Sequence, residues 1–538
     1  MNVNDQDNTD YYAIGPYLST IRGLDLPTTA EHRQYIINQL LIAIKDYYVH
    51  LPIKRAAFTI DPVQELTLLL NKQDSDYEGL SFFQQLLSII NRLRDRHTVI
   101  TLPLPWKNLV AYIPILIEHY MDGASPKYII SKKLYGYKND ALEPGTTLTH
   151  WNGVPIDSYL ARNLASTSQG SNIFAAKELA LANLTIRPLA YSIPPDEDWV
   201  TLSCITPSGK PQTWVFPWKY FAQPIQTDTS NQSTKGQAHA LTNGLDSRML
   251  HVNKCKRNFF QRKDSPLKKA DLYQDLTPVD DYLLYGTLTT ASGKVGYLRF
   301  YSFEVGNLSA FIRKIVSVLK QLPQDRLIVD IRGNPGGLIP AGESLAQLLC
   351  QHPISTSPVA FRNTSSTAKL GKLNGFTLWE RSLDLANVTG EVFSQHFSLT
   401  DVASLTDYRY PGKTALIIDA LCYSTCDFLS ADFKDNKIGP IVGTSGRTGA
   451  GGANVWPFDT LVQFAMQAGD SRLAPLPFGM GLNIAMRRSI RTEQSAGLPV
   501  EDLGVEPDYI HHLTYDDLLY RNVDLLNFTA DLLKQSSP

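Results

Sequence analysis

The sequence predicts a multidomain α+β fold, because its residue pattern changes twice along the 538 positions. Up to about residue 105, apolar residues recur at helical spacing. Residues 106–222 contain short β-like runs separated by turns, and residues 286–515 alternate buried-strand runs with helical segments. The chain is 43% hydrophobic, which is enough for two to four domains with real cores.

The first two segments are a polar tail, residues 1–27, and a helical region, residues 28–105. The tail lacks the charged start and apolar stretch of a signal peptide, so we expect a cytoplasmic protein or one whose presequence was already removed. The helical region carries apolar stripes at 36–44 and 82–90, each continuing over several turns.

Residues 106–222 are predicted to be β-rich, and residues 223–285 are predicted to be a polar insert or linker. The β-like runs include 128–130 and 199–202. The polar part of the insert, 223–272, shows no clear periodicity and has seven basic residues between Lys254 and Lys269. A disordered surface loop is the favoured interpretation of that composition, ahead of a binding patch.

The last segments are an α/β region, residues 286–515, and a C-terminal helix within residues 516–538. Buried strands are expected at 295–300 and 327–330. Helices are expected between the strands, at 308–319, 341–349 and 426–433.

Composition excludes several classes of protein. The net charge is −2, from 50 basic and 52 acidic residues, so nothing indicates a nucleic-acid partner. No run reaches the length of a membrane helix, and no Cys/His pattern has zinc spacing, so we expect neither a membrane span, nor a metal, nor a cofactor. Five cysteines are too few and scattered for a disulfide framework; Cys422 and Cys426 could bridge one helical turn, but buried free thiols are commoner.

Two stretches could carry chemistry, although each has a plainer interpretation. In LRDRHTVITLP, His97 follows a predicted helix; a lone histidine is usually structural or on the surface. In LIVDIRGNPGGLIPAG, a buried strand ends in a glycine loop that could present N–H groups to a ligand or be an ordinary turn. The loop lacks the G-x-G-x-x-G spacing and the lysine of a phosphate-binding loop.

Ser424, in ALCYSTCDFLSADF, lies where a predicted strand passes into a helix. A serine there can simply cap the helix. The same position also exposes a hydroxyl beside free N–H groups, where a nucleophile and an oxyanion hole can be built together. The G-x-S-x-G pattern is absent, which excludes the nucleophile elbow of the α/β-hydrolases.

Taken in order, these stretches resemble the C-terminal processing (tail-specific) serine protease superfamily. The residues that carry the resemblance are DRHT, LEPGTTLTHWNGVPID, DIRGNPGGLIPAG, IGPIVGTSGRTGAGG and GLPVEDLGVEPDYIHH, within about residues 28 to 515. The resemblance is closer to the branch of the tricorn core and the chlamydial protease-like activity factor than to the serine–lysine branch. It implies an N-terminal helical domain, a PDZ-like domain at 106–222 and an α/β protease core of the ClpP/crotonase type.

The resemblance also implies the roles of the site residues. Ser424 aligns with the nucleophile, and the backbone N–H groups of Gly336 or Gly337 and of Thr425 align with the oxyanion hole. His97 fits a general base, because imidazole titrates near neutral pH. Glu501 fits the carboxylate that orients the base. Three neighbouring acids could be confused with it: Asp502, Glu506 and Asp508.

Two departures from the family pattern bear on the base. Gly451 stands where the serine–lysine branch has its lysine, and Lys434 is ten residues into the helix, roughly 15 Å along its axis from Ser424. Arg96 replaces the serine that precedes the histidine in the tricorn core, so Glu501 is expected to act directly or through another group.

The resemblance therefore implies a serine endopeptidase acting on protein or peptide substrates, with a PDZ-like domain that binds or gates them. Alternatives are an inactive ligand-binding protein on the same fold and a serine–lysine peptidase with another base. A cysteine hydrolase fails, because Cys422 and Cys426 do not hold the nucleophile's place. The polar part of the insert would either cover the cleft until self-cleavage or be a tether, and a homodimer is left open.

Overall fold

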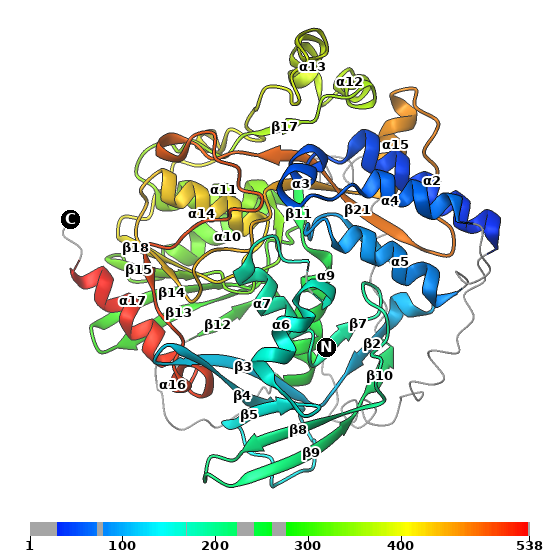
Figure 1. Cartoon of the computed structure of the whole chain (residues 1–538). Coiled ribbons are helices and arrows are strands. Elements are labelled where there is room, and N and C mark those ends of the chain that lie inside the picture. The colour runs from blue at the N-terminus through cyan, green and yellow to red at the C-terminus, as the bar shows by residue number, and fades with distance from the viewer. Residues whose placement is uncertain (1–28, 73–78, 168, 223–241, 261–275, 536–538) are drawn as a thin grey trace.

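The computed structural model describes residues 29–72, 79–167, 169–222, 242–260 and 276–535 (Figure 1). It confirms a multidomain α+β fold. Among these residues, no helix combines the length and the apolar character needed to cross a membrane.

The N-terminal helices pack onto the rest of the molecule instead of standing apart. They are α2 (Ala30–Ile42), α3 (Leu51–Phe58), α4 (Pro62–Asn71) and α5 (Leu80–Asn91). The strand that follows, β1 (Val99–Thr101), pairs antiparallel with β21 (Gly481–Ser489). The buried apolar residues of these helices belong to one cluster with those of α15 (Phe458–Gln467), which lies beside them in Figure 1.

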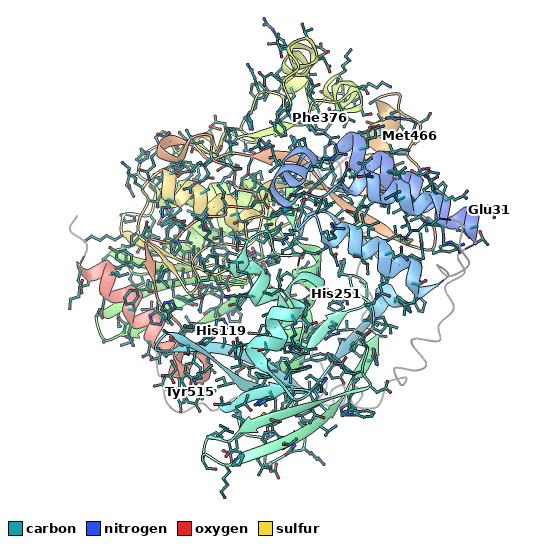
Figure 2. The ribbon with its side chains drawn as sticks, viewed as in Figure 1. Glu31, His119, His251, Phe376, Met466 and Tyr515 are labelled. Atoms are coloured by element: carbon teal, nitrogen blue, oxygen red, sulfur yellow. The ribbon has the colours of Figure 1, made fainter. Side chains whose placement is uncertain are left out.

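The β-rich region contains two sheets and two helices. The larger sheet has the order β3 (Ile115–Asp122), β4 (Ser125–Lys133), β5 (Thr146–Trp151), β8 (Trp199–Ile205), β9 (Pro211–Pro217), with β6 (Val154–Pro155) on β5. The smaller has the order β10 (Lys219–Ala222), β2 (Leu109–Tyr112), β7 (Ile186–Pro188). The α-helices are α6 (Ile156–Thr167) and α7 (Ile173–Ala182). Helix α7 is tied to β3 by the His119–Glu178 pair, at 2.5 Å. Figure 2 labels His119.

The core sheet carries the site. Its order is β12 (Thr277–Val279), β13 (Leu283–Thr290), β14 (Gly293–Phe300), β15 (Arg326–Asp330), β18 (Lys413–Ile418), β19 (Ile441–Gly443), β22 (Tyr509–Ile510). From β14 to β22 the neighbours are parallel. Alternate residues point to opposite faces, so Leu327 and Val329 join one cluster and Ile328 joins another.

Helices cover both faces of this sheet. Buried residues of α10 (Leu308–Leu319), α11 (Ile339–Leu349) and α14 (Thr425–Asp435) pack on one face, and those of α17 (Val523–Gln535) pack on the other. The predicted helix at 308–319 is confirmed, and those at 341–349 and 426–433 lie within α11 and α14. The remaining elements are β17 (Val359–Phe361), α12 (Ser365–Gly371), α13 (Thr377–Thr389), β20 (Ala453–Pro457) and α16 (Tyr515–Leu519).

The prediction of an insert without regular structure is wrong for residues 242–260. They form β11 (Asn243–Leu245) and α9 (Ser247–Phe260), and α9 buries an apolar face at helical spacing: Met249, Val252, Cys255 and Phe259. The basic residues between these positions made the helical spacing of the apolar residues hard to recognise in the sequence. The end of the segment was also misplaced, because β12 and β13 of the core sheet begin before residue 285. Residues 223–241 and 261–275 lie outside the described residues.

Candidate active site

Ser424 lies at the junction of β18 and α14 in a backbone conformation that is rare for a side-chain-bearing residue, φ 63° and ψ −113°. The backbone N–H of Ser424 donates to Asp427 Oδ2 at 2.7 Å, which holds the turn. The side chain is fully buried, and Oγ has no hydrogen-bond partner among the described residues. Ser424 therefore presents a hydroxyl that no described residue engages in a hydrogen bond.

The glycine loop approaches Ser424 closely, and only glycine fits there. It contains β16 (Gly336–Leu338), with Gly336 at φ 91° and Gly337 at φ 145°. A Cβ added at Gly336 would lie 2.9 Å from the Cβ of Ser424. Thr425 Oγ1 donates to the carbonyl of Gly337 at 2.9 Å, which locks the loop to the start of α14.

The three proposed oxyanion donors differ in their hydrogen bonds. The N–H of Gly336 already donates to Asn334 Oδ1 at 2.9 Å. Thr425 is the first residue of α14, where a backbone N–H has no acceptor within the helix. Thr425 therefore suits an oxyanion better than Gly336 does, while Gly337 lies opposite Gly244 in the ladder of β16 with β11.

His97 lies between α5 and β1, and its ring contacts Tyr423, the residue before Ser424. Its centroid is 4.6 Å from that of Tyr423, and its backbone N–H donates to Asp95 Oδ1 at 2.8 Å. Within the described chain, neither ring nitrogen has a hydrogen-bond partner. Burial lowers the pKa of His97 to about 4, although the Asp95 and Asp246 carboxylates oppose this. The imidazole is therefore neutral at neutral pH and able to accept a proton.

Glu501 is buried, and the residues that it contacts through its carboxylate are Lys54, Gly452 and His50. Its Oε1 accepts a hydrogen bond from Lys54 Nζ at 2.6 Å, and its Oε2 accepts one from the N–H of Gly452 at 3.1 Å. His50 Nε2 lies 3.6 Å from Oε2. The structure thus brings Lys54 and His50 of the helical region to Glu501, and neither was among the predicted residues.

Lys54 is the cation of this buried cluster. It also contacts Asp502, so one ammonium faces several carboxyl groups. Burial opposes its charge, but Glu501, Asp502 and Asp95 outweigh burial and raise the pKa of Lys54. Burial raises the pKa of Glu501, and the Asp95 and Asp502 carboxylates add to this, although Lys54 acts to lower it.

The same cluster contains three groups of the types that bind metals, in His50, Asp95 and Glu501, whose donor atoms lie within 4.8 Å of one another. However, Lys54 already holds Glu501 Oε1. Both carboxylate oxygens of Asp95 accept hydrogen bonds, from the His97 N–H and from Thr98 Oγ1. Two of the three groups, the carboxylates of Asp95 and Glu501, are thus engaged with donors of the protein itself.

The geometry also bears on the alternative bases. A Cβ added at Gly451 would lie 2.5 Å from Tyr423 Cζ, so a lysine at that position would displace the ring. Lys434 Nζ donates to the carbonyl of Glu506 at 2.7 Å and pairs with Asp508 at 3.1 Å, near the far end of α14. Because its pKa is raised, Lys54 holds its proton and is unsuited to act as a base.

The two cysteines near Ser424 are free and buried, as expected. Burial raises the pKa of both thiols, with the Asp419 carboxylate adding to this for Cys422 and the Asp427 carboxylate for Cys426. Cys422 Sγ donates to the carbonyl of Ile331 at 3.0 Å. Thiols that resist ionisation are poor nucleophiles, which argues against a cysteine hydrolase.

Part of the insert lies directly on Ser424. Strand β11 pairs antiparallel with β16, with Gly244 opposite Gly337. A Cβ added at Gly244 would lie 2.3 Å from Ser424 Oγ. The carbonyl of Asn243 accepts a hydrogen bond from Asn454 Nδ2 at 2.7 Å. A strand of the chain itself therefore occupies the space in front of Ser424.

Comparisons with known proteins bear on the family of the core region and on the fold. Residues 294–510 match the model of peptidase family S41. A carboxyl-terminal-processing protease of Picosynechococcus sp. is 28% identical over 116 residues, which is 20% of this chain and 28% of that protein. The match thus spans just over a quarter of that relative's length.

Solved structures show the same fold over nearly the whole chain. Mature CPAF complexed with lactacystin has a TM-score of 0.67 at 17% identity, covering 94% of this chain and 99% of that one. A crystal structure of mature CPAF also has a TM-score of 0.67 at 17% identity, covering 95% of this chain and 99% of that one. At this identity the likeness concerns the fold alone.

Proposed function

Because this chain belongs to peptidase family S41 through residues 294–510, we propose that it is a serine endopeptidase with Ser424 as nucleophile and His97 as general base. The observation that carries the proposal is the Ser424 hydroxyl. It is held at a strained strand-to-helix turn without a hydrogen-bond partner among the described residues, beside a loop that only glycine fits.

In the proposed reaction, Ser424 Oγ attacks the carbonyl carbon of a peptide bond. His97 takes the hydroxyl proton and later gives it to the leaving amine. The N–H groups of Gly337 and Thr425 stabilise the oxyanion, a role worth about 3–4 kcal/mol per donor in other serine proteases. At neutral pH the imidazole of His97 is unprotonated, because burial lowers its pKa to about 4, so its ring is available to accept the hydroxyl proton.

We assign Glu501 an indirect part. Its contacts with Lys54 and His50, together with Asp95 on the His97 backbone, support a role in which the buried cluster fixes the loop that carries the base. The PDZ-like assignment of residues 106–222 is likewise a proposal. An exposed edge of that sheet would add a peptide substrate as a further strand.

The proposed enzyme is latent in the conformation described. Strand β11 fills the place in front of Ser424, so a substrate must displace it. This supports the cover interpretation of the insert over the tether. Deleting residues 225–270 would not test it, because that deletion removes α9 and its buried side chains. Displacement of β11 has to be tested with single substitutions.

A fluorophosphonate probe tests the proposal. The full chain is incubated with the probe and digested, and the labelled peptide is identified by mass spectrometry. Labelling of Ser424 that is absent from Ser424→Ala supports the peptidase. A folded parent chain that stays unlabelled, also after prolonged incubation and in Asp246→Asn, supports a ligand-binding protein on the same fold.

A further inference from the structure

Arg96 and Asp246 form a buried ion pair beside Ser424 that the proposed reaction does not use. Arg96 Nε donates to Asp246 Oδ2 at 2.7 Å, and both side chains are at most 3% exposed. Arg96 precedes the general base, and Asp246 directly follows β11. The pair thus connects the catalytic centre with the strand that covers it.

We propose that Arg96 determines specificity by binding an acidic side chain of the substrate, two positions after the residue that lies against Ser424. This rests on the proposed function, and it names the substrate class as peptides with Asp or Glu at that position. In the latent chain, Asp246 fills the place of that side chain.

Strand β11 lies as an extended substrate would. It adds an antiparallel strand to β16, which is the recurring way in which proteins bind extended peptides. Gly244 is the residue against Ser424, and the ladder continues beyond β11, because the N–H of Asp246 donates to the carbonyl of Pro335 at 2.9 Å. A substrate in this register would place its second following residue at the position of Asp246.

Arg96 is held in place by contacts that do not involve β11. Its guanidinium lies 4.1 Å over the ring of Tyr423, and its backbone N–H donates to Tyr423 Oη at 3.1 Å. Tyr423 is fully buried and adjacent to Ser424. The cation therefore stays beside the nucleophile when β11 leaves.

Asp246 is the carboxylate with which the Arg96 guanidinium pairs in the described parts of the chain. The nearest acids in sequence and in the cluster are engaged elsewhere, Asp95 with Thr98 and Glu501 with Lys54. A bound substrate would bury the guanidinium again in place of β11, where a missing counterion is unfavourable, and an acidic substrate side chain would restore the pair. A neutral or basic side chain would leave it unpaired, which is how charge selectivity arises.

The plainer interpretation is that the pair only helps α9 to fold. Asp246 Oδ1 accepts the N–H of Met249 at 3.0 Å, as a helix cap does. The two interpretations differ in what they predict for cleavage of a separate peptide, because a folding role gives Arg96 no contact with substrate.

The experiment uses the full chain, incubated until its hydrolysis of peptide reaches a constant rate. The probes are matched short peptides containing Asn-Gly-Leu-Asp, Asn-Gly-Leu-Asn or Asn-Gly-Leu-Lys, and kcat/KM is compared within each protein. The parent is expected to prefer the Asp peptide over the Asn peptide by about 10- to 100-fold. Arg96→Gln is expected to lose this preference, and Arg96→Glu to favour the Lys peptide.

Equal kcat/KM for the Asp and Asn peptides in the parent would overturn the proposal, and this holds whether or not the Arg96 variants fold. A preference that persists in folded Arg96→Gln would also overturn it. Neither result would contradict the proposed function. That function fails separately if Ser424 is not labelled by the fluorophosphonate probe.

Discussion

Two buried ion pairs lie near His97, and they connect different parts of the chain. Lys54–Glu501 joins the helical region to the closing motif of the protease core, while Arg96–Asp246 joins the base-bearing loop to β11. Both are nearly excluded from solvent. The first pair lies between elements that are packed into large apolar clusters, whereas the second ends on a strand in front of the nucleophile.

The comparison shows that the cost of losing a buried ion pair depends on whether the segments around it can move apart. Breaking a buried pair costs most where the remaining charge cannot reach water. If the Lys54–Glu501 pair is broken, the remaining charge cannot reach water, because the segments around it stay packed in the folded protein. Arg96 is exposed to solvent once β11 leaves, so loss of Asp246 should release the cover more than it unfolds the protein.

The largest expected effect is on stability, in Lys54→Met. Removal of the ammonium leaves Glu501 and its neighbouring carboxylates without a cation, and we expect a loss of about 3–5 kcal/mol in the free energy of unfolding. Lys434→Met is the matched control, because the Lys434–Asp508 pair is partly exposed and worth at most about 1 kcal/mol. Urea unfolding measures both. Equal losses would contradict the comparison.

Asp246→Asn is expected to lower the free energy of unfolding less than Lys54→Met does, but to increase the access of a probe to Ser424. Asparagine keeps the cap on α9 and loses the ion pair with Arg96. The fluorophosphonate probe should label Ser424 faster than in the parent, while the free energy of unfolding should fall by less than in Lys54→Met. Unchanged labelling would mean that the pair does not hold β11 in place.

The time course of activity sharpens the contrast further. If β11 covers the cleft and is removed by self-cleavage, peptide hydrolysis should begin after a lag that shortens as enzyme concentration rises. Ser424→Ala should remain one uncut chain on a denaturing gel. Immediate full activity in the parent, without cleavage, would reduce β11 to a strand that substrates displace reversibly.

The smallest expected effect is a shift of the pH profile. Burial lowers the pKa of His97 to about 4, so the imidazole stays neutral, and able to accept a proton, down to that range. As pH falls through this value the base becomes protonated and kcat/KM declines. The acid limb should therefore lie below the ordinary imidazole pKa of about 6.5. A limb near or above that value would contradict the burial of His97 in the active state.

The core of the fold could be predicted from local patterns. In helix α10 and strands β14 and β15, the spacing of the apolar residues in the sequence predicts which side chains are buried. The insert was misread because α9 mixes its four buried apolar residues with many cations. Asp246, three residues before Met249 at the start of that spacing, was the cap signal that could have revealed it.

The position of Ser424 at the start of a helix could be predicted, but its surroundings could not. Ser424 stands at a strand-to-helix junction that local sequence identifies. Lys54 lies on a short amphipathic helix where a lysine is normally solvated, and its burial depends on a carboxylate 447 positions away. Nothing local predicts such a contact. For the same reason, the sequence could not show that Arg96 faces a carboxylate from the insert.

The measurement that tests the central claim most directly is peptide turnover by His97→Ala, with Lys434→Ala as the matched control. The account predicts that His97→Ala stays folded and loses at least about 100-fold in kcat, because the general base is gone. Lys434→Ala should keep nearly full activity, since that ammonium binds Glu506 and Asp508 away from Ser424. Full activity in His97→Ala, or its loss in folded Lys434→Ala alone, would contradict the assignment of His97 as the base.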